Sequence, residues 1–266
     1  MRQAARARHA VGRRRLGRFR CRRCCGGSRM SICLTADSVG KTRGSRKTLR
    51  DVSFTLEAGR HLAVFGSNGA GKTTLLRILA LLDRPSTGSV AVLDGETPLD
   101  PVDARARMGF VTHMPQLYLD LTAEENLVLF ARLYGVPDAG RRARDLLDSV
   151  GLLHRRDDVV RGFSRGMTQR MAIARALVND PDILLLDEVY SGLDPRAAAD
   201  VRALVRRDAE KRIIVEVSHD FESGVADCTD VLMLERGRTD GVVARSDASI
   251  DDLRARYRAL LQGVAS

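Results

Sequence analysis

The residues best suited to chemistry form one short run early in the chain: Gly66, Ser67, Asn68, Gly69, Ala70, Gly71, Lys72, Thr73 and Thr74. The run fits the pattern G-x-x-x-x-G-K-[ST], whose glycines let the backbone curl until several N–H groups face one hollow. A helix that begins at Lys72 would direct the positive end of its dipole at the same hollow. In such loops the lysine reaches the β- and γ-phosphates, and the next hydroxyl, here that of Thr73, holds Mg²⁺. The run therefore predicts a site for a nucleoside triphosphate.

The segments on either side of this run support the interpretation. Residues 61–65 have the pattern of a short apolar strand, and residues 74–80 have the pattern of a helix. Strand, loop and helix thus follow in the order that a phosphate-binding loop requires. A glycine-rich turn without function is the alternative, and the agreement of the three elements argues against it.

Two carboxylates follow a second buried strand. Residues 183–186 form a continuous apolar run of the kind that a parallel sheet buries on both faces, and the run leads directly into Asp187 and Glu188. Adjacent carboxylates at such a strand end are costly unless they bind a cation or move protons. Asp187 is suited to hold Mg²⁺, and Glu188 is suited to polarise the water that attacks a phosphate. A solvated strand end is the alternative.

Three further segments stand at the ends of predicted elements, where parallel α/β sheets gather their functional groups. Ser164 is a natural N-cap, and the helix N-terminus that it begins is suited to a phosphate. His219 follows the apolar strand Ile213–Val217 and could sense a γ-phosphate through a hydrogen bond. Residues 191–194 form a turn just after the carboxylate pair. An ordinary capped helix, a structural histidine and a plain turn are the alternatives.

The elements that must position these groups alternate between strands and helices, which predicts an α/β fold. Residues 115–165 differ from the rest, because Thr122 and Glu125 form a capping box and apolar residues then recur at helical spacing. We therefore expect a helical insert within one domain of residues 30–266. Turn residues at 40–46 separate the first two strands. Strands are predicted at 31–36, 52–56, 90–93, 108–112 and 213–217, and further helices at 141–150, 196–207 and 251–261.

Composition limits the class of protein. The chain of 266 residues is 44% hydrophobic, which is enough for a sizeable core. No uninterrupted apolar run reaches the ~18 residues that a membrane-spanning helix needs. The formal charge of +10 arises in residues 1–30, which hold eleven arginines and no acid, so the remainder has a net charge near −1. The body of the protein therefore gives no electrostatic reason to expect nucleic acid.

The basic tail, residues 1–29, has few apolar residues and is expected to be disordered. Three origins are open for it: translation that begins at Met30, which the abrupt change of composition favours; a basic arm for anionic lipid or nucleic acid; and an organelle transit peptide. The cysteines of the tail lack a second Cys/His pair at metal-site spacing. Cys33 and Cys228 are isolated and are expected to be reduced core residues of a cytosolic protein.

Taken in order, these motifs resemble those of the ATP-binding cassette (ABC) ATPase family, and the resemblance covers residues 31–240. GSNGAGKTT is similar to the Walker A motif, FSRGMTQR to the signature motif, ILLLDE to Walker B, SGLD to the D-loop and VSHD to the histidine switch. The resemblance implies an ATPase that uses Mg²⁺. It also implies a mostly parallel core sheet, an antiparallel β subdomain and an inserted helical subdomain.

In this family two cassettes pair head to tail and bury two ATP molecules between them. The resemblance implies a homodimer in which ATP contacts the Walker A loop of one subunit and, in trans, the signature residues of the other: Ser164, Arg165, Gly166 and Met167. Glu188 would be the general base, His219 would assist it, and Asp194 would couple the subunits. The insert would dock onto integral-membrane permease subunits at the cytoplasmic face of the cell membrane. The permease would contact the cargo, and no direct contact with nucleic acid is expected.

Several positions depart from the family pattern. Arg165 and Met167 stand where the signature usually has a glycine and a glutamine. His113 replaces the glutamine that senses Mg²⁺, and Gln116 follows three residues later, so either residue is a candidate for that role. Arg43 occupies the place of the aromatic residue that stacks on adenine, and a guanidinium can also stack on a base.

Two of these departures resemble one subgroup. His113, residues 117–127 and the sequence S-R-G-M are similar to the ATP-binding subunit of the haem exporter used in cytochrome c maturation. The first hypothesis is therefore the ATP-hydrolysing subunit of a haem-export complex. Export of another cargo, such as a lipid, a drug or a polysaccharide, is the second. A non-transport ABC ATPase that acts on nucleic acid or the ribosome is the third, and the near-neutral body of the chain argues against it.

Overall fold

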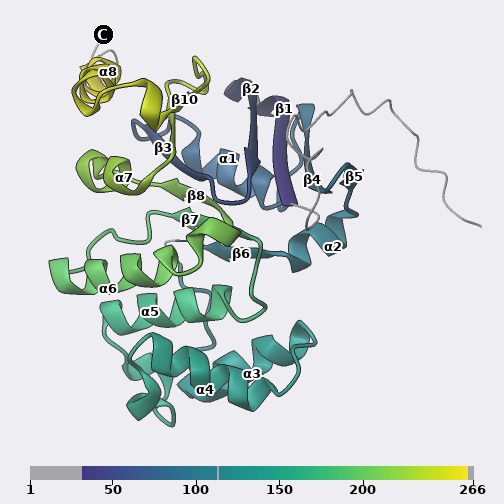
Figure 1. Cartoon of the computed structure of the whole chain (residues 1–266), viewed down its shortest axis with the longest axis vertical. Helices are drawn as coiled ribbons and strands as arrows, with labels where there is room; N and C mark the ends of the chain where they lie inside the picture. Colours follow the sequence, from purple (N-terminus) through teal and green to yellow (C-terminus); the bar gives the residue numbers. More distant parts are fainter. Residues whose placement is uncertain (1–31, 113, 263–266) are drawn as a thin grey trace, which may run out of the picture.

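The computed structural model describes residues 32–112 and 114–262, and it places two β-sheets among helices (Figure 1). The basic tail and His113 lie outside the described residues. The first sheet is antiparallel, with the strand order β2-β1-β4-β5. Its strands are β1 (Ile32–Arg43), β2 (Arg46–Glu57), β4 (Thr87–Asp94) and β5 (Thr97–Pro98).

The first hairpin corrects the turn predicted over residues 40–46. The two strands leave only Gly44 and Ser45 between them, so the turn is shorter and the strands are longer than expected. Gly40 lies inside β1, where a Cβ atom would collide with the Thr87 side chain of β4. The pairing of β1 with β2 shifts its register at three places between Ala36 and Thr42, as in β-bulges. These shifts accommodate the residues that interrupt the alternation of buried and exposed side chains. The strand therefore bends at these residues and does not end there.

The second sheet has the strand order β10-β9-β3-β8-β7-β6, and its neighbours pair in parallel except for β10 with β9. All residues of β3, β7 and β8 are buried, as expected for strands that are covered on both faces. The carboxyl ends of these three neighbours meet at one edge of the sheet. The strands are β3 (His61–Gly66), β6 (Met108–Val111), β7 (Ile183–Asp187), β8 (Ile213–Val217), β9 (Asp230–Leu234) and β10 (Val242–Ala244).

Helices occupy both sides of the second sheet (Figure 1). The capping box predicted for α3 is confirmed, because the Oγ1 of Thr122 accepts from the Glu125 amide at 3.2 Å and the Glu125 carboxylate accepts from the Thr122 amide at 2.9 Å. Helices α3 and α4 form the lower part of the molecule in Figure 1. The helices are α1 (Lys72–Leu79), α2 (Pro101–Ala106), α3 (Ala123–Leu133), α4 (Ala139–Ser149), α5 (Arg165–Ala176), α6 (Pro195–Arg206), α7 (Phe221–Asp227) and α8 (Ile250–Gln262).

The described residues form three hydrophobic cores, and the two larger ones lie on opposite faces of the second sheet. One core joins the first sheet and α1 to this sheet, and it includes Leu75 and Leu185. The other joins α3, α4, α5 and α6 to the opposite face, and it includes Leu127 and Leu184. Adjacent residues of β7 thus point into different cores, as the alternation of a strand requires. Within residues 32–112 and 114–262, no helix combines the length and the hydropathy that a membrane crossing requires.

Candidate functional site

The phosphate loop joins the carboxyl end of β3 to the first turn of α1. Its backbone passes through left-handed conformations at Gly69 (φ 78°) and Gly71 (φ 109°), which residues with a Cβ atom rarely adopt. A Cβ atom on Gly71 would lie 2.7 Å from the carbonyl oxygen of Thr48. The Gly237 amide, in the turn after β9, donates to the Ala70 carbonyl at 2.9 Å. Contacts from two other segments thus fix the shape of the loop.

Lys72 folds back over this loop. Its Nζ donates to the carbonyl oxygen of Gly66 at 2.8 Å and to that of Ser67 at 3.1 Å. The residue is only 6% exposed. Burial lowers the pKa of its ammonium group, although the charges of Glu188 and Asp187 act in the opposite direction. A cation held over the loop by carbonyl groups is well placed to exchange those partners for phosphate oxygens.

The carboxylate pair and the histidine meet at the same edge of the second sheet. β7 ends at the buried Asp187, and the neighbouring strand β8 leads to His219. Glu188 has a positive φ of 56°, and its amide donates to the Val217 carbonyl at 3.0 Å. Its Oε1 lies 2.5 Å from the Nε2 of His219. A carboxylate oriented in this way by an imidazole is suited to proton transfer with a nearby water.

A cavity of about 550 Å³ lies against the phosphate loop, which is a size typical of small-molecule sites. It brings the loop together with Glu188 and with Arg43, which the sequence singled out. Arg46 and Thr48 also line it, and no sequence pattern indicated them. The guanidinium of Arg46 lies 3.7 Å from the position that a Cβ atom on Gly69 would occupy. The lining residues are Arg43, Arg46, Thr48, Asn68, Gly69, Gly71, Lys72, Thr73, Thr74 and Glu188.

Arg43 lies at this cavity with an acidic partner. Its Nη2 donates to the Oδ2 of Asp83 at 3.0 Å, and the same oxygen accepts from the Nε of Arg77 at 3.0 Å. The pKa of the Asp83 carboxyl is lowered, chiefly by the hydrogen bond from Arg77. The side chain of Arg43 is 56% exposed, so a flat base can still reach its guanidinium.

The signature residues lie apart from this cavity, at the start of α5. The Oγ of Ser164 accepts from the Met167 amide at 3.3 Å, so the predicted N-cap is confirmed. The Nη2 of Arg165 donates to the Ser191 carbonyl at 2.8 Å, and its guanidinium lies against Gly192. This contact ties the start of α5 to the turn after β7. Among the described residues, those of the signature do not line the phosphate cavity.

Two other residues that the sequence singled out have partners away from the phosphate cavity. Asp194 caps α6, because its Oδ1 accepts from the Ala197 amide at 2.9 Å. Gln116 has a positive φ of 52°, and its Oε1 accepts from the Nη2 of Arg175 at 3.0 Å. Arg175 belongs to α5, and burial lowers its pKa. The segment at the start of the insert is thus bonded to the helix that carries the signature.

Comparisons with known proteins agree with this arrangement. The family model described as ABC transporter matches residues 49–191. The chain is 40% identical to the ABC transporter ATP-binding protein NatA of Bacillus subtilis (strain 168) over 72% of this chain and 79% of that protein. It is 36% identical to the Nod factor export ATP-binding protein I of Burkholderia lata over 76% of this chain and 67% of that protein.

A solved structure supports the fold. The ATP-binding cassette MJ0796, solved as a dimer in a post-hydrolysis state bound to ADP and Pi, matches with a TM-score of 0.71 and 26% identity. The match covers 80% of this chain and 98% of that one. The family model covers more than half of the sequence, and a relative of 40% identity aligns over most of its own length. The chain therefore belongs to the ABC transporter family and is an ATP-hydrolysing, ATP-binding subunit.

Proposed function

We propose that the chain drives an ABC export complex as a homodimer, with Glu188 as the general base for ATP hydrolysis. The observation that carries this proposal is the 2.5 Å contact between Glu188 and His219 beside the cavity of the phosphate loop. Glu188 accepts a proton from the attacking water, and His219 orients its carboxylate. Lys72 neutralises the β- and γ-phosphates.

The same site fits a magnesium ion. Thr73, which carries a hydroxyl group, lines the cavity, and the buried Asp187 ends strand β7. A hydroxyl and a carboxylate are oxygen ligands of the kind that Mg²⁺ prefers. When bound, the ion would neutralise charge on the phosphates. His113 or Gln116 is proposed to sense it, and the bond from Gln116 to α5 would carry that signal to the signature.

The position of the signature supports a shared ATP site. Ser164 and Gly166 begin a capped helix whose N-terminus is suited to phosphate, yet they do not line the phosphate cavity within the described chain. A second copy placed head to tail would bring its signature to the ATP. The related cassette MJ0796 was solved as a dimer. Asp194 would then lie near the junction of the two copies.

Arg165→Ala is expected to lower ATP turnover by about tenfold while the affinity for ATP stays within about twofold. Arg165 does not line the phosphate cavity, but it holds the carbonyl of Ser191 in the turn that precedes α6. Steady-state ATPase assays and calorimetric titration with ATP measure the two effects. Arg161→Ala, which breaks only an exposed pair with Asp120, is the matched control. Equal losses of affinity and turnover would contradict a role in the dimer.

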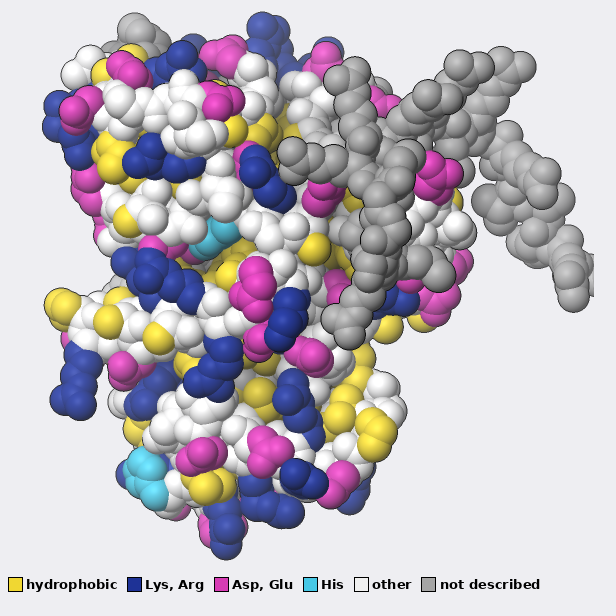
Figure 2. Space-filling view, in the orientation of Figure 1, with side chains coloured by type: hydrophobic (Ala, Val, Ile, Leu, Met, Phe, Trp, Pro, Cys, Tyr) yellow, Lys and Arg dark blue, Asp and Glu magenta, His cyan; other side chains and the backbone are white. Residues whose placement is uncertain are grey.

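Exposed hydrophobic side chains support a membrane partner for the helical part. Figure 2 shows hydrophobic groups gathered at the lower right edge of the molecule, over the region of α3. Exposed apolar groups clustered in this way mark interaction sites more often than isolated ones do. We propose that permease subunits dock here, at the cytoplasmic face of the membrane. In α3 and the residues next to it in the chain, the exposed large hydrophobic side chains are Met114, Tyr118, Leu119, Leu133 and Tyr134.

Leu133→Arg is expected to abolish recovery of the permease from detergent-solubilised membranes without changing the basal ATPase rate. Leu133 is 69% exposed, so a charge there disturbs a docking surface and not the core. Leu82→Arg, at a residue 51% exposed in the loop after α1, is the control. Affinity purification followed by mass spectrometry measures the recovery. An undiminished permease yield from the Leu133 variant would place the docking surface elsewhere.

For the cargo, we propose haem export in cytochrome c maturation as the first candidate. The support is the resemblance carried by His113 and by Ser164, Arg165, Gly166 and Met167. Neither relative reported above is named for haem, and one is named a Nod factor export ATP-binding protein, so a different exported cargo is the second candidate. The identity of the permease recovered with the wild-type chain decides between them.

A further inference from the structure

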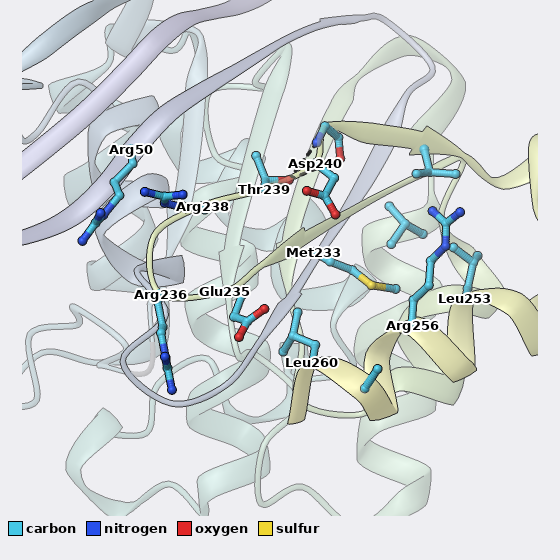
Figure 3. A pocket seen from close by; sticks show the side chains of 14 residues that line it. Arg50, Met233, Glu235, Arg236, Arg238, Thr239, Asp240, Leu253, Arg256 and Leu260 are labelled. Carbon is cyan, nitrogen blue, oxygen red and sulfur yellow. Dashed lines mark hydrogen bonds between the residues drawn. The ribbon is translucent and has the colours of Figure 1, made fainter. Parts of the chain in front are cut away.

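A second cavity, of about 830 Å³, lies between α8 and the connection from β9 to β10 (Figure 3). It shares no lining residue with the cavity of the phosphate loop. Figure 3 shows Met233 extending from β9 toward the helix that carries Leu253 and Arg256. The floor is apolar and comes from both sides of the cavity: Val231, Met233, Val243, Leu253 and Leu260.

The rim of this cavity is positively charged. Four arginines and two acids line it, which leaves an excess of two positive charges. Arg256 has an acidic neighbour in Asp252, whose pKa is lowered first by hydrogen bonds from Ser249 and then by the charge of Arg256. Part of the positive charge on α8 is thus already balanced. The charged residues of the rim are Arg50, Arg236, Arg238, Arg256, Glu235 and Asp240.

Arg50 and Arg238 carry the unbalanced charge. The Arg50 amide donates to the Gly237 carbonyl at 2.7 Å, so the backbone segments that carry the two arginines are neighbours, and both residues line the cavity. Within the part of the chain that the structure describes, neither guanidinium has a hydrogen bond or an ion pair. Two such groups beside an apolar floor offer planar, bidentate partners to a carboxylate or a phosphate.

We propose that this cavity binds a free amphiphile with one anionic head and one alkyl chain. The head lies between Arg50 and Arg238, and the chain covers the apolar floor formed by β9, β10 and α8. Val231, Leu253 and Leu260 of that floor are buried and Met233 and Val243 are partly buried, which suits a chain in solution better than the surface of a bilayer. A ligand of this kind pairs with the two arginines and also covers the apolar floor. Inorganic phosphate can only pair with the arginines, and a neutral alkane can only cover the floor.

Displacement of a fluorescent fatty acid from the full chain tests the site. Dodecanoate and dodecyl phosphate are expected to displace the probe in a saturable way, while dodecanol and inorganic phosphate do so at least about tenfold more weakly. Arg50→Glu and Arg238→Glu are each expected to weaken the binding of dodecanoate and of dodecyl phosphate by about tenfold. Ala259→Trp, which fills the cavity from α8, should remove displacement without changing any charge.

Matched variants on the same helix separate the site from general effects. Arg258→Glu and Ala255→Trp alter exposed residues of α8 that do not line the cavity, and both should bind like the wild type. Equal displacement by dodecanol, or full binding by the Arg50 and Arg238 variants, would overturn the proposal. If the protein binds phosphatidylglycerol vesicles but none of the free amphiphiles, the cavity and its charged rim would instead be a contact site for a membrane surface. If the wild type binds no amphiphile and the Ala259 variant loses self-association, the cavity would instead be a contact site for a second copy of the chain.

Discussion

Glu188→Gln is expected to lower ATP turnover by about 10³-fold while ATP binding stays within about twofold of the wild type. The glutamine amide keeps the size of the side chain and a hydrogen bond to His219, but it cannot accept a proton from water. In the proposed cycle, ATP hydrolysis reopens the dimer, so a variant that cannot hydrolyse ATP would stay closed. The variant should therefore accumulate as an ATP-bound dimer, which single-turnover hydrolysis and light scattering with and without ATP would detect.

The control for this result is Glu210→Gln, which changes an acid whose side chain is 73% exposed. It should hydrolyse ATP at the wild-type rate and remain in the wild-type oligomeric state. Unchanged turnover in the Glu188 variant would remove this residue as the base. A dimer that forms equally well without ATP would show that the interface does not depend on the shared nucleotide.

Lys72→Ala is expected to weaken ATP binding by about 10- to 100-fold, because it removes charge-assisted hydrogen bonds to the phosphates. The lysine is buried at 6% exposure, and burial lowers its pKa. Bound phosphates favour the charged ammonium, so its pKa is higher in the complex than in the free protein and binding takes up a proton. The affinity of the wild type should therefore fall as the pH rises through the lowered pKa of the free state, and the alanine variant should lose this dependence.

Titration with a fluorescent ATP analogue across the alkaline range measures both effects. Lys211→Ala removes an exposed lysine that pairs with Asp208 at 2.6 Å, and it should bind ATP like the wild type. If the Lys72 variant bound ATP as tightly as the wild type, or lost affinity at alkaline pH to the same extent, another cation would hold the phosphates. Arg46, which lies over Gly69, would then be the first alternative.

Much of the phosphate loop and its surroundings could be predicted because the signals are local. Glycine spacing encodes the loop, and an apolar run that ends in Asp187 and Glu188 encodes a buried strand with carboxylates at its end. The strand order then brings β3, β7 and β8 together, so groups 100 or more residues apart in the chain meet at one edge. The capping box at Thr122 is equally local, and the structure reproduces it.

Other features depend on contacts that no local pattern reveals. Arg46 reaches the cavity only because β1 and β2 form a longer hairpin than turn residues indicate. Aromatic packing places α7 and α8 against β3, since the ring centroids of Phe65 and Phe221 lie 5.1 Å apart and those of Phe221 and Tyr257 also lie 5.1 Å apart. The cavity beside α8 follows from that packing. Its arginines come from three separate segments, and nothing in their spacing indicates a common site.

The two hydrophobic cores on opposite faces of the second sheet have a consequence for how this fold diversifies. Helices α3 and α4 share their core with α5 and α6, while the phosphate loop rests on the other core, with Leu75 and Ala70. Replacing the insert with that of a relative should disturb only one of these interiors. The half that holds the phosphate loop could then be inherited unchanged while the half that we propose to dock onto the permease is exchanged, so that the same ATPase core serves transporters with unrelated cargo.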